Sequence, residues 1–173
     1  MSQLNVNTIT TLSGTDITIP TGKKLVVTDA GGLVVPGTVV QVAQGAVGGT
    51  GVSTTSTSKV TFGASASITP KSSSNSILVL ATGGWYTTSG TATEFALSLD
   101  RSGTVIGTDG LVPILSNAES GDSYSITYWD SPSTTSSITY TVKAHRINPG
   151  NMTLYNGVRG SQTNRIFLIE FAQ

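Results

Sequence analysis

The sequence predicts an all-β protein in which an N-terminal stalk of short intertwined strands precedes a jelly-roll-like antiparallel β-sandwich head. Three observations lead to this fold class. No window of a dozen residues carries apolar side chains at the helical period of 3.6. The 51 Ser and Thr residues and 20 Gly of the 173-residue chain are typical of strands and turns. Several segments alternate apolar and polar residues at the period of two that a half-buried strand requires.

Residues 1–37 form the predicted stalk. Short apolar pairs two residues apart recur here, separated by turns such as Pro20-Thr21-Gly22 and Pro36-Gly37. Strands this short bury too little surface to offset the entropy lost on ordering, unless identical chains wrap around one another. A floppy tail is the alternative. The expected stalk contacts between copies are Leu4, Val6, Ile9, Ile17, Ile19, Leu25 and Val27.

Residues 38–173 form the predicted head. A Gly, Ser and Thr stretch over Gln44–Ser58 is expected to be a surface loop. The spacing of the remaining short apolar segments favours a two-sheet sandwich or jelly roll. The expected strands are Val39–Val42, Val60–Phe62, a short one at Ile68, Ile77–Tyr86, Glu94–Asp100, Thr104–Thr108, Tyr124–Trp129, Ile138–Arg146, Met152–Asn156 and Ile166–Phe171.

The last expected strand is apolar on both faces. Phe167, Ile169 and Phe171 share one face, and Ile166 and Leu168 share the other. One sandwich covers only one side of each sheet. We therefore expect Ile166 and Leu168 to lie at an interface between copies of the head. The alternative is that a loop of the same chain covers them.

Composition argues against most catalytic and ligand chemistry. Nine Lys and Arg balance nine Asp and Glu, so there is no basic footprint for nucleic acid. The chain has no Cys and only one His, His145, which we expect to face solvent. The acidic residues are scattered, and Glu119 and Asp122 are the only close pair. We expect no catalytic residue, cofactor or metal, no membrane insertion, and no secretion signal in residues 1–10.

Aromatic residues near strand ends are the remaining candidates for ligand binding. Trp85, Trp129 and Asp130 could contact a sugar, because aromatic faces stack on the C–H face of a pyranose while carboxylates bind its hydroxyls. A place in the sandwich core is the alternative for both Trp residues. For four Tyr residues we favour the core: Tyr86, Tyr124, Tyr128 and Tyr140.

Three segments resemble small fibre and knob proteins of tailed bacteriophages, notably phages of marine bacteria and cyanobacteria. These segments are Leu4-Asn5-Val6-Asn7-Thr8-Ile9, the block from Ile17 to Leu25, and Tyr128-Trp129-Asp130-Ser131-Pro132. The resemblance implies a homotrimer that docks on the tail or capsid through its N-terminal arm. It also implies an outward head that contacts a host-surface glycan, in a protein that is assembled in the host cytoplasm and exposed on the virion. A capsid decoration protein and a free carbohydrate-binding module are the alternatives, and a hydrolase would need clustered acids.

Overall fold

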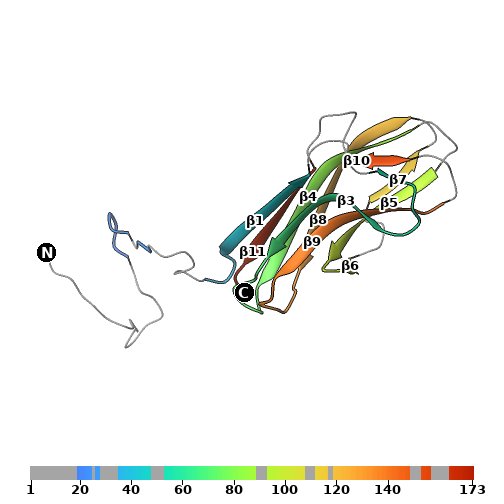
Figure 1. Ribbon diagram of the computed structural model, residues 1–173. Coiled ribbons are helices and arrows are strands. Elements are labelled where there is room, and N and C mark those ends of the chain that lie inside the picture. The colour runs from blue at the N-terminus through green and yellow to red at the C-terminus, as the bar shows by residue number, and fades with distance from the viewer. Residues whose placement is uncertain are drawn as a thin grey trace. The chain divides into compact units, whose positions relative to one another are not determined.

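Two antiparallel β-sheets face each other and contain all the strands that the structure describes (Figure 1). The structure is a computed structural model and describes residues 19–24, 26–27, 35–47, 53–88, 93–107, 112–116, 119–148, 153–156 and 164–173. These residues include no helix and form antiparallel sheets in a sandwich-like arrangement, so the prediction of an all-β, sandwich-like fold is confirmed. The chain divides into two units, Met1–Leu33 and Val34–Gln173, and every strand assigned in the described residues belongs to the second.

Each sheet is four strands wide along most of its length. In the first sheet β4 pairs with β8 on one side, and with β11 and then β10 on the other. The first sheet contains β1 (Val39–Val47), β2 (Ser53–Thr54), β4 (Ser76–Thr87), β8 (Ser120–Asp130), β10 (Leu154–Asn156) and β11 (Asn164–Phe171). The second sheet contains β3 (Val60–Ile68), β5 (Thr93–Arg101), β6 (Thr104–Ile106), β7 (Val112–Ser116) and β9 (Ile138–Arg146).

The strand pairs are nested along the chain like the two arms of one long hairpin. β1 pairs with β11, β2 with β10, β3 with β9, β4 with β8, and β5 with both β6 and β7. Successive long strands therefore alternate between the two sheets from β3 to β5 and from β7 to β9. This nesting brings residues close to the two ends of the head side by side in β1 and β11 (Figure 1).

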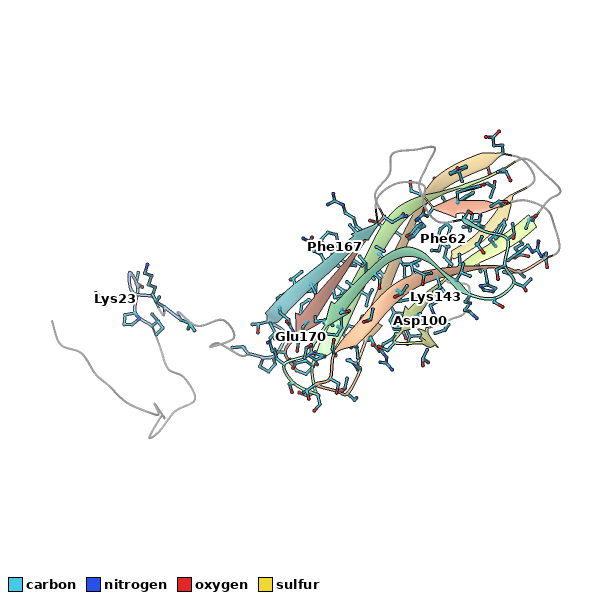
Figure 2. The ribbon with its side chains drawn as sticks, viewed as in Figure 1. Lys23, Phe62, Asp100, Lys143, Phe167 and Glu170 are labelled. Atoms are coloured by element: carbon cyan, nitrogen blue, oxygen red, sulfur yellow. The ribbon has the colours of Figure 1, made fainter. Side chains whose placement is uncertain are left out.

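The core lies between the sheets and is mostly aliphatic. Phe62, labelled in Figure 2, is fully buried there, as are Phe95 and Tyr140. Ile77, Val79 and Ala81 of β4 have no exposed surface, because every second residue of this central strand points inward.

A pair of glycines lets β4 change partners. β11 pairs with β4 as far as Thr82, and β10 takes over at Trp85. Across this gap Asn164 accepts a hydrogen bond from the Gly84 N–H through Oδ1, at 3.0 Å. A Cβ atom on Gly83 would lie 1.6 Å from the same oxygen. A glycine is therefore required here, and β4 continues through Gly83 and Gly84 to Thr87.

One side of the sandwich is closed by the approach of β1 to β3. A Cβ atom built on Gly45 would lie 1.9 Å from the Ser65 carbonyl oxygen, so the two backbones nearly touch. Ala43, two residues earlier on the same face of β1, packs against the core. Small residues on this face let an edge strand of one sheet lie against an edge strand of the other.

Hydrogen bonds to Glu170 lock the end of the head where the chain enters. Glu170 has no exposed surface and is labelled in Figure 2. Its carboxylate accepts hydrogen bonds from Gln41 Nε2 at 2.5 Å, from the Lys71 N–H at 2.7 Å and from Asn75 Nδ2 at 2.6 Å. Three donors, from β1 and from the segment between β3 and β4, compensate for removing this carboxylate from water.

The strand predictions hold for the central strands and fail at several ends. The predicted loop over Gln44–Ser58 contains the last residues of β1 and the short β2. β3 is one strand of nine residues with a bulge between Thr61 and Ser65, although two separate strands were expected at Val60–Phe62 and at Ile68. β7 was not predicted at all.

We predict that Gly45→Val destabilises the head by about 2–3 kcal/mol, because the added side chain overlaps the backbone of β3. Ala46→Val is the matched control, since Ala46 is exposed on the opposite face of the same strand and the β-propensity of the new residue is the same. Urea unfolding followed by circular dichroism measures both. Equal stability of the two variants would contradict the close approach of β1 to β3.

Candidate interaction surface

A row of apolar side chains crosses the outer face of the first sheet. Val42 of β1 pairs with Ile169 of β11, Ile169 pairs with Leu78 of β4, and Leu78 pairs with Trp129 of β8. Directly paired residues of antiparallel strands point to the same face. The four side chains therefore form one continuous row across all four strands, on the face away from the core.

Neighbouring rows extend this surface. Phe167 of β11, labelled in Figure 2, pairs with Leu80, and Phe171 pairs with Val39. The rings of Trp129 and Phe171 are in contact, with centroids 5.2 Å apart. We call the whole set the outer apolar patch; it consists of Val39, Val42, Leu78, Leu80, Trp129, Phe167, Ile169 and Phe171.

The outer apolar patch is open to solvent in a single chain. Val42 exposes 58% of its surface, Val39 54% and Trp129 50%, and the other members are half-buried. A soluble chain rarely leaves so many adjoining apolar side chains uncovered unless they form an interaction surface. The patch is therefore the strongest candidate interaction surface among the described residues.

β11 buries in the core the face that we expected at an interface between heads, and it exposes the opposite face. Ile166 and Leu168 have no exposed surface and belong to the core of their own chain. They cannot contact a second copy, so their assignment to a head interface is corrected. The face of β11 available to a partner is that of Phe167, Ile169 and Phe171.

Few of the predicted stalk residues lie in described parts of the chain. Ile19 and Val27 are exposed, with 46% and 42% of their surface accessible. The turn between them has a Lys23 N–H to Pro20 carbonyl hydrogen bond of 3.0 Å, with Gly22 at φ 78°. Leu4, Val6, Ile9, Ile17 and Leu25 lie outside the described residues.

The three candidate receptor residues do not form one site. Trp129 pairs with Leu78 on the outer face, whereas Trp85 pairs with Asp122 and packs against the core. Seven positions along β4 separate the two rows, about 23 Å at 3.3 Å per residue. Asp130 is buried and points inward, so it is not free to bind a sugar hydroxyl.

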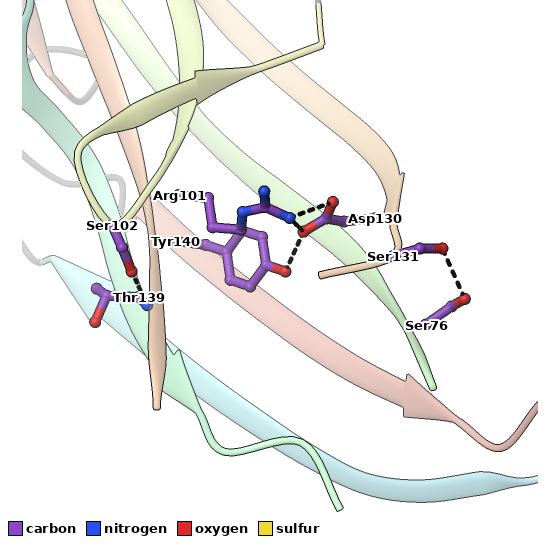
Figure 3. Close-up of polar contacts among 7 residues, drawn as sticks. All are labelled: Ser76, Arg101, Ser102, Asp130, Ser131, Thr139 and Tyr140. Carbon is purple, nitrogen blue, oxygen red and sulfur yellow. Dashed lines mark hydrogen bonds and ion pairs between the residues drawn. The ribbon is translucent and has the colours of Figure 1, made fainter. Parts of the chain in front are cut away.

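Asp130 instead joins the two sheets. Its carboxylate accepts hydrogen bonds from Arg101 at 2.8 and 2.9 Å and from the Tyr140 hydroxyl at 2.5 Å (Figure 3). Asp130 ends β8 in the first sheet, and Arg101 and Tyr140 lie on β5 and β9 of the second. On β9 and β5, Lys143 also pairs with Asp100 at 3.2 Å. These contacts stabilise the sandwich and leave Asp130 no role at the surface.

Two buried tyrosines differ in the pairing of their hydroxyls. Burial, then the hydrogen bond and negative charge of Asp130, raise the pKa of Tyr140 far above its usual value, and Arg101 partly opposes this. Burial alone raises the pKa of Tyr124. The Tyr124 hydroxyl is buried without a hydrogen-bond partner among the described residues, and lies where a side chain on Gly63 would be.

The described residues also bear on the other expected kinds of site. His145 lies on the same face of β9 as Lys143, as expected, but it is only partly exposed and its Nδ1 is buried. Within the described ranges no group of three His, Cys, Asp or Glu side chains could hold a metal ion. Nor do those ranges contain a helix long and apolar enough to cross a membrane.

Comparison with known proteins gives no further assignment. No protein-family model matches the chain, and no curated protein matches it. The function must therefore be argued from the surfaces of the chain itself.

We predict opposite effects for two Tyr→Phe substitutions. Tyr140→Phe removes a hydrogen bond to a carboxylate and lowers the free energy of unfolding by about 2 kcal/mol. Tyr124→Phe removes a buried hydroxyl that has no partner in the described chain, and raises it by about 1 kcal/mol. Urea unfolding at pH 7 measures both, and a loss of stability in both variants would contradict the difference in pairing.

Alkaline pH is expected to unfold the wild-type head through the same two groups. In the unfolded chain a tyrosine side chain loses its proton at about pH 10. In the folded chain both pKa values are higher, so above that pH the unfolded state binds fewer protons and the free energy of unfolding falls. The stability that the two raised pKa values contribute is fully present below about pH 10, and it is lost as the pH rises above that value. The slope between pH 10 and 12 should be shallower in Tyr124→Phe, as denaturant unfolding at several pH values would show; an unchanged slope would contradict the effect of burial.

Proposed function

We propose that this chain is a non-enzymatic structural protein of a bacteriophage particle that forms a short homotrimeric fibre or knob. Its outer apolar patch is the contact between heads, and its N-terminal arm docks on the tail or capsid. The observation that carries the proposal is the uncovered row Val42, Ile169, Leu78 and Trp129. The number three, the phage setting and the docking role of the arm come from the resemblance of the sequence to phage fibre and knob proteins.

The topology of the head supports this assignment. We infer that the head is a jelly roll, because nested antiparallel pairs that wrap into two facing sheets define that fold. Jelly rolls are common in viral capsid and lectin domains. Fold alone does not determine function, so the patch carries more weight than the topology.

The place where the chain enters the head fits assembly through the patch. The Gly37 N–H donates to the Ala172 carbonyl at 2.8 Å, and the Ala172 N–H donates to the Thr38 carbonyl at 2.9 Å. The entry segment thus pairs with the C-terminal segment beside Val39 and Phe171, two members of the patch. Copies that associate through the patch would bring their entry segments to the same end, as an intertwined stalk requires.

The chemistry of the patch favours a second copy over a different occupant. Its members are aliphatic and aromatic, and the centre of an interface between identical chains is depleted in charge in this way. Paired rows beyond the patch become polar, with Thr82 opposite Arg165 and Ser125. An apolar centre with a polar margin is the usual pattern of a protein interface.

We predict that Ile169→Glu converts the trimer into folded monomers. A charge at the centre of the patch would be buried without a partner in the assembly, yet it stays in water in the separate chain. Light scattering of the full-length protein at micromolar concentration measures the mass, and circular dichroism reports the fold. A variant that remains trimeric would exclude the patch as the interface.

Two variants serve as controls for this change. Ser125→Glu adds the same charge on the outer face of the edge strand β8, beyond the patch, and should leave the trimer intact. Leu168→Glu places the charge in the core and should unfold the head rather than dissociate it. A wild-type protein that is monomeric at micromolar concentration would overturn the proposed assembly.

The setting on a phage particle needs a separate experiment. Mass spectrometry and immunogold labelling of a purified particle would give the copy number and position of the protein. A few copies in multiples of three at the tail or on the capsid are expected for a fibre or knob. Copies in a number that covers the whole capsid shell would identify a decoration protein instead.

A further inference from the structure

A second aromatic surface lies near the other end of the first sheet. Tyr86 of β4 pairs directly with Tyr155 of β10, and their rings are stacked with centroids 4.6 Å apart and an angle of 10° between planes. Both side chains are half-buried. The sequence-based expectation that Tyr86 lies in the core is wrong, because it is Trp85, the neighbouring residue, that packs against the core.

The hydroxyls and one ring face of this pair are available. Neither Tyr86 nor Tyr155 has a hydrogen-bond partner for its hydroxyl among the described residues. On the side of Tyr86 away from Tyr155 the paired residue is Gly121, on the edge strand β8. A Cβ on Gly121 would lie 2.9 Å from the Tyr86 Cβ, so the paired strand β8 places no side chain against this side of the ring at this position.

The surroundings are hydroxylic rather than apolar. The residue paired with Tyr155 on its other side is Ser53, and Ser123 lies two positions beyond Gly121 on the same face of β8. Both serines are exposed. In these rows no Lys or Arg pairs with the two tyrosines. This distinguishes the site from the outer apolar patch, whose nearest residue on β4, Leu80, is six positions away, about 20 Å.

We propose that Tyr86 and Tyr155 form a binding platform for a neutral pyranose, a hexose or an N-acetylhexosamine. The C–H face of the sugar stacks on the face of Tyr86 beside Gly121, which has no side chain of its own. The Ser123 hydroxyl and the two phenolic hydroxyls lie on the same face of the sheet. They supply the polar contacts that orient the hydroxyls of the sugar. A charged sugar is disfavoured because the paired rows hold no cation.

This inference rests on the proposed function and deepens it, because it names the class of ligand that the head binds. It also places the binding site at the tyrosine pair instead of at Trp85, Trp129 and Asp130. Its geometry lies within one chain. The binding experiment can therefore fail while the trimer is found, or succeed while the trimer is not.

The test uses the full-length protein and an array of neutral hexose and N-acetylhexosamine oligosaccharides, followed by calorimetry with the best-bound oligosaccharide in solution. Calorimetry with a soluble oligosaccharide gives the affinity of a single site, without the gain from several sites on one surface. We expect binding by the wild type, and a loss of about tenfold or more in Tyr86→Ala and Tyr155→Ala.

Matched variants separate binding from folding. Thr82→Ala changes an exposed residue on the same face of β4, four positions from Tyr86 and outside the outer apolar patch, and should leave the calorimetric affinity unchanged. Tyr86→Phe keeps the stacking ring and should retain more affinity than Tyr86→Ala. Circular dichroism of each variant checks the fold. Failure of the wild type to bind any neutral glycan of the array, or alanine variants that bind as well as the wild type, would overturn the proposal.

Discussion

The structure depends on the fact that a sandwich made by one chain covers only one face of each of its sheets. In β4 and β11, two adjacent inner strands of the first sheet, both faces are apolar. The inward residues, such as Val79 and Leu168, are fully buried, and the outward residues, such as Leu78 and Ile169, are left half-exposed. A single chain therefore buries only one apolar face of these strands, and the proposed association would cover the other.

Polar contacts fix the end of the head that lies under this surface. Glu170 ties β11 to β1 and to the segment before β4, and Asp130 ties β8 to the opposite sheet. Both carboxylates occupy the row of Ile77 on the core side, one position along β4 from the row of Leu78. A surface that must match a second copy benefits from a rigid support, because side chains already held in place lose less entropy on association.

Sequence reasoning predicts the fold class and most central strands because period-two alternation is local. It fails where structure depends on distant partners. The predicted loop over Gln44–Ser58 is rich in small residues, yet Gly45 is small because β1 must approach the backbone of Ser65. β7 gives no clear alternation and is a strand because β5 provides its partner. Tyr86 and Trp85 are neighbours of similar character, and only the register with Tyr155 and Asn156 places Tyr86 outward and Trp85 toward the core.

The alternation of residues along β11 could not decide which of its two apolar faces lies in the core. One face carries Phe167, Ile169 and Phe171, and the other carries Ile166 and Leu168 between the polar Asn164 and Glu170. Hydrophobicity alone would place the first face in the core, but the structure buries the second, because Asn164 bonds to Gly84 and Glu170 accepts three hydrogen bonds at their ends of the strand. A strand that buries its more polar face and exposes its more apolar one is poorly suited to an isolated soluble domain. That inverted arrangement is the strongest structural reason to regard the outer apolar patch as a surface meant for contact with another chain.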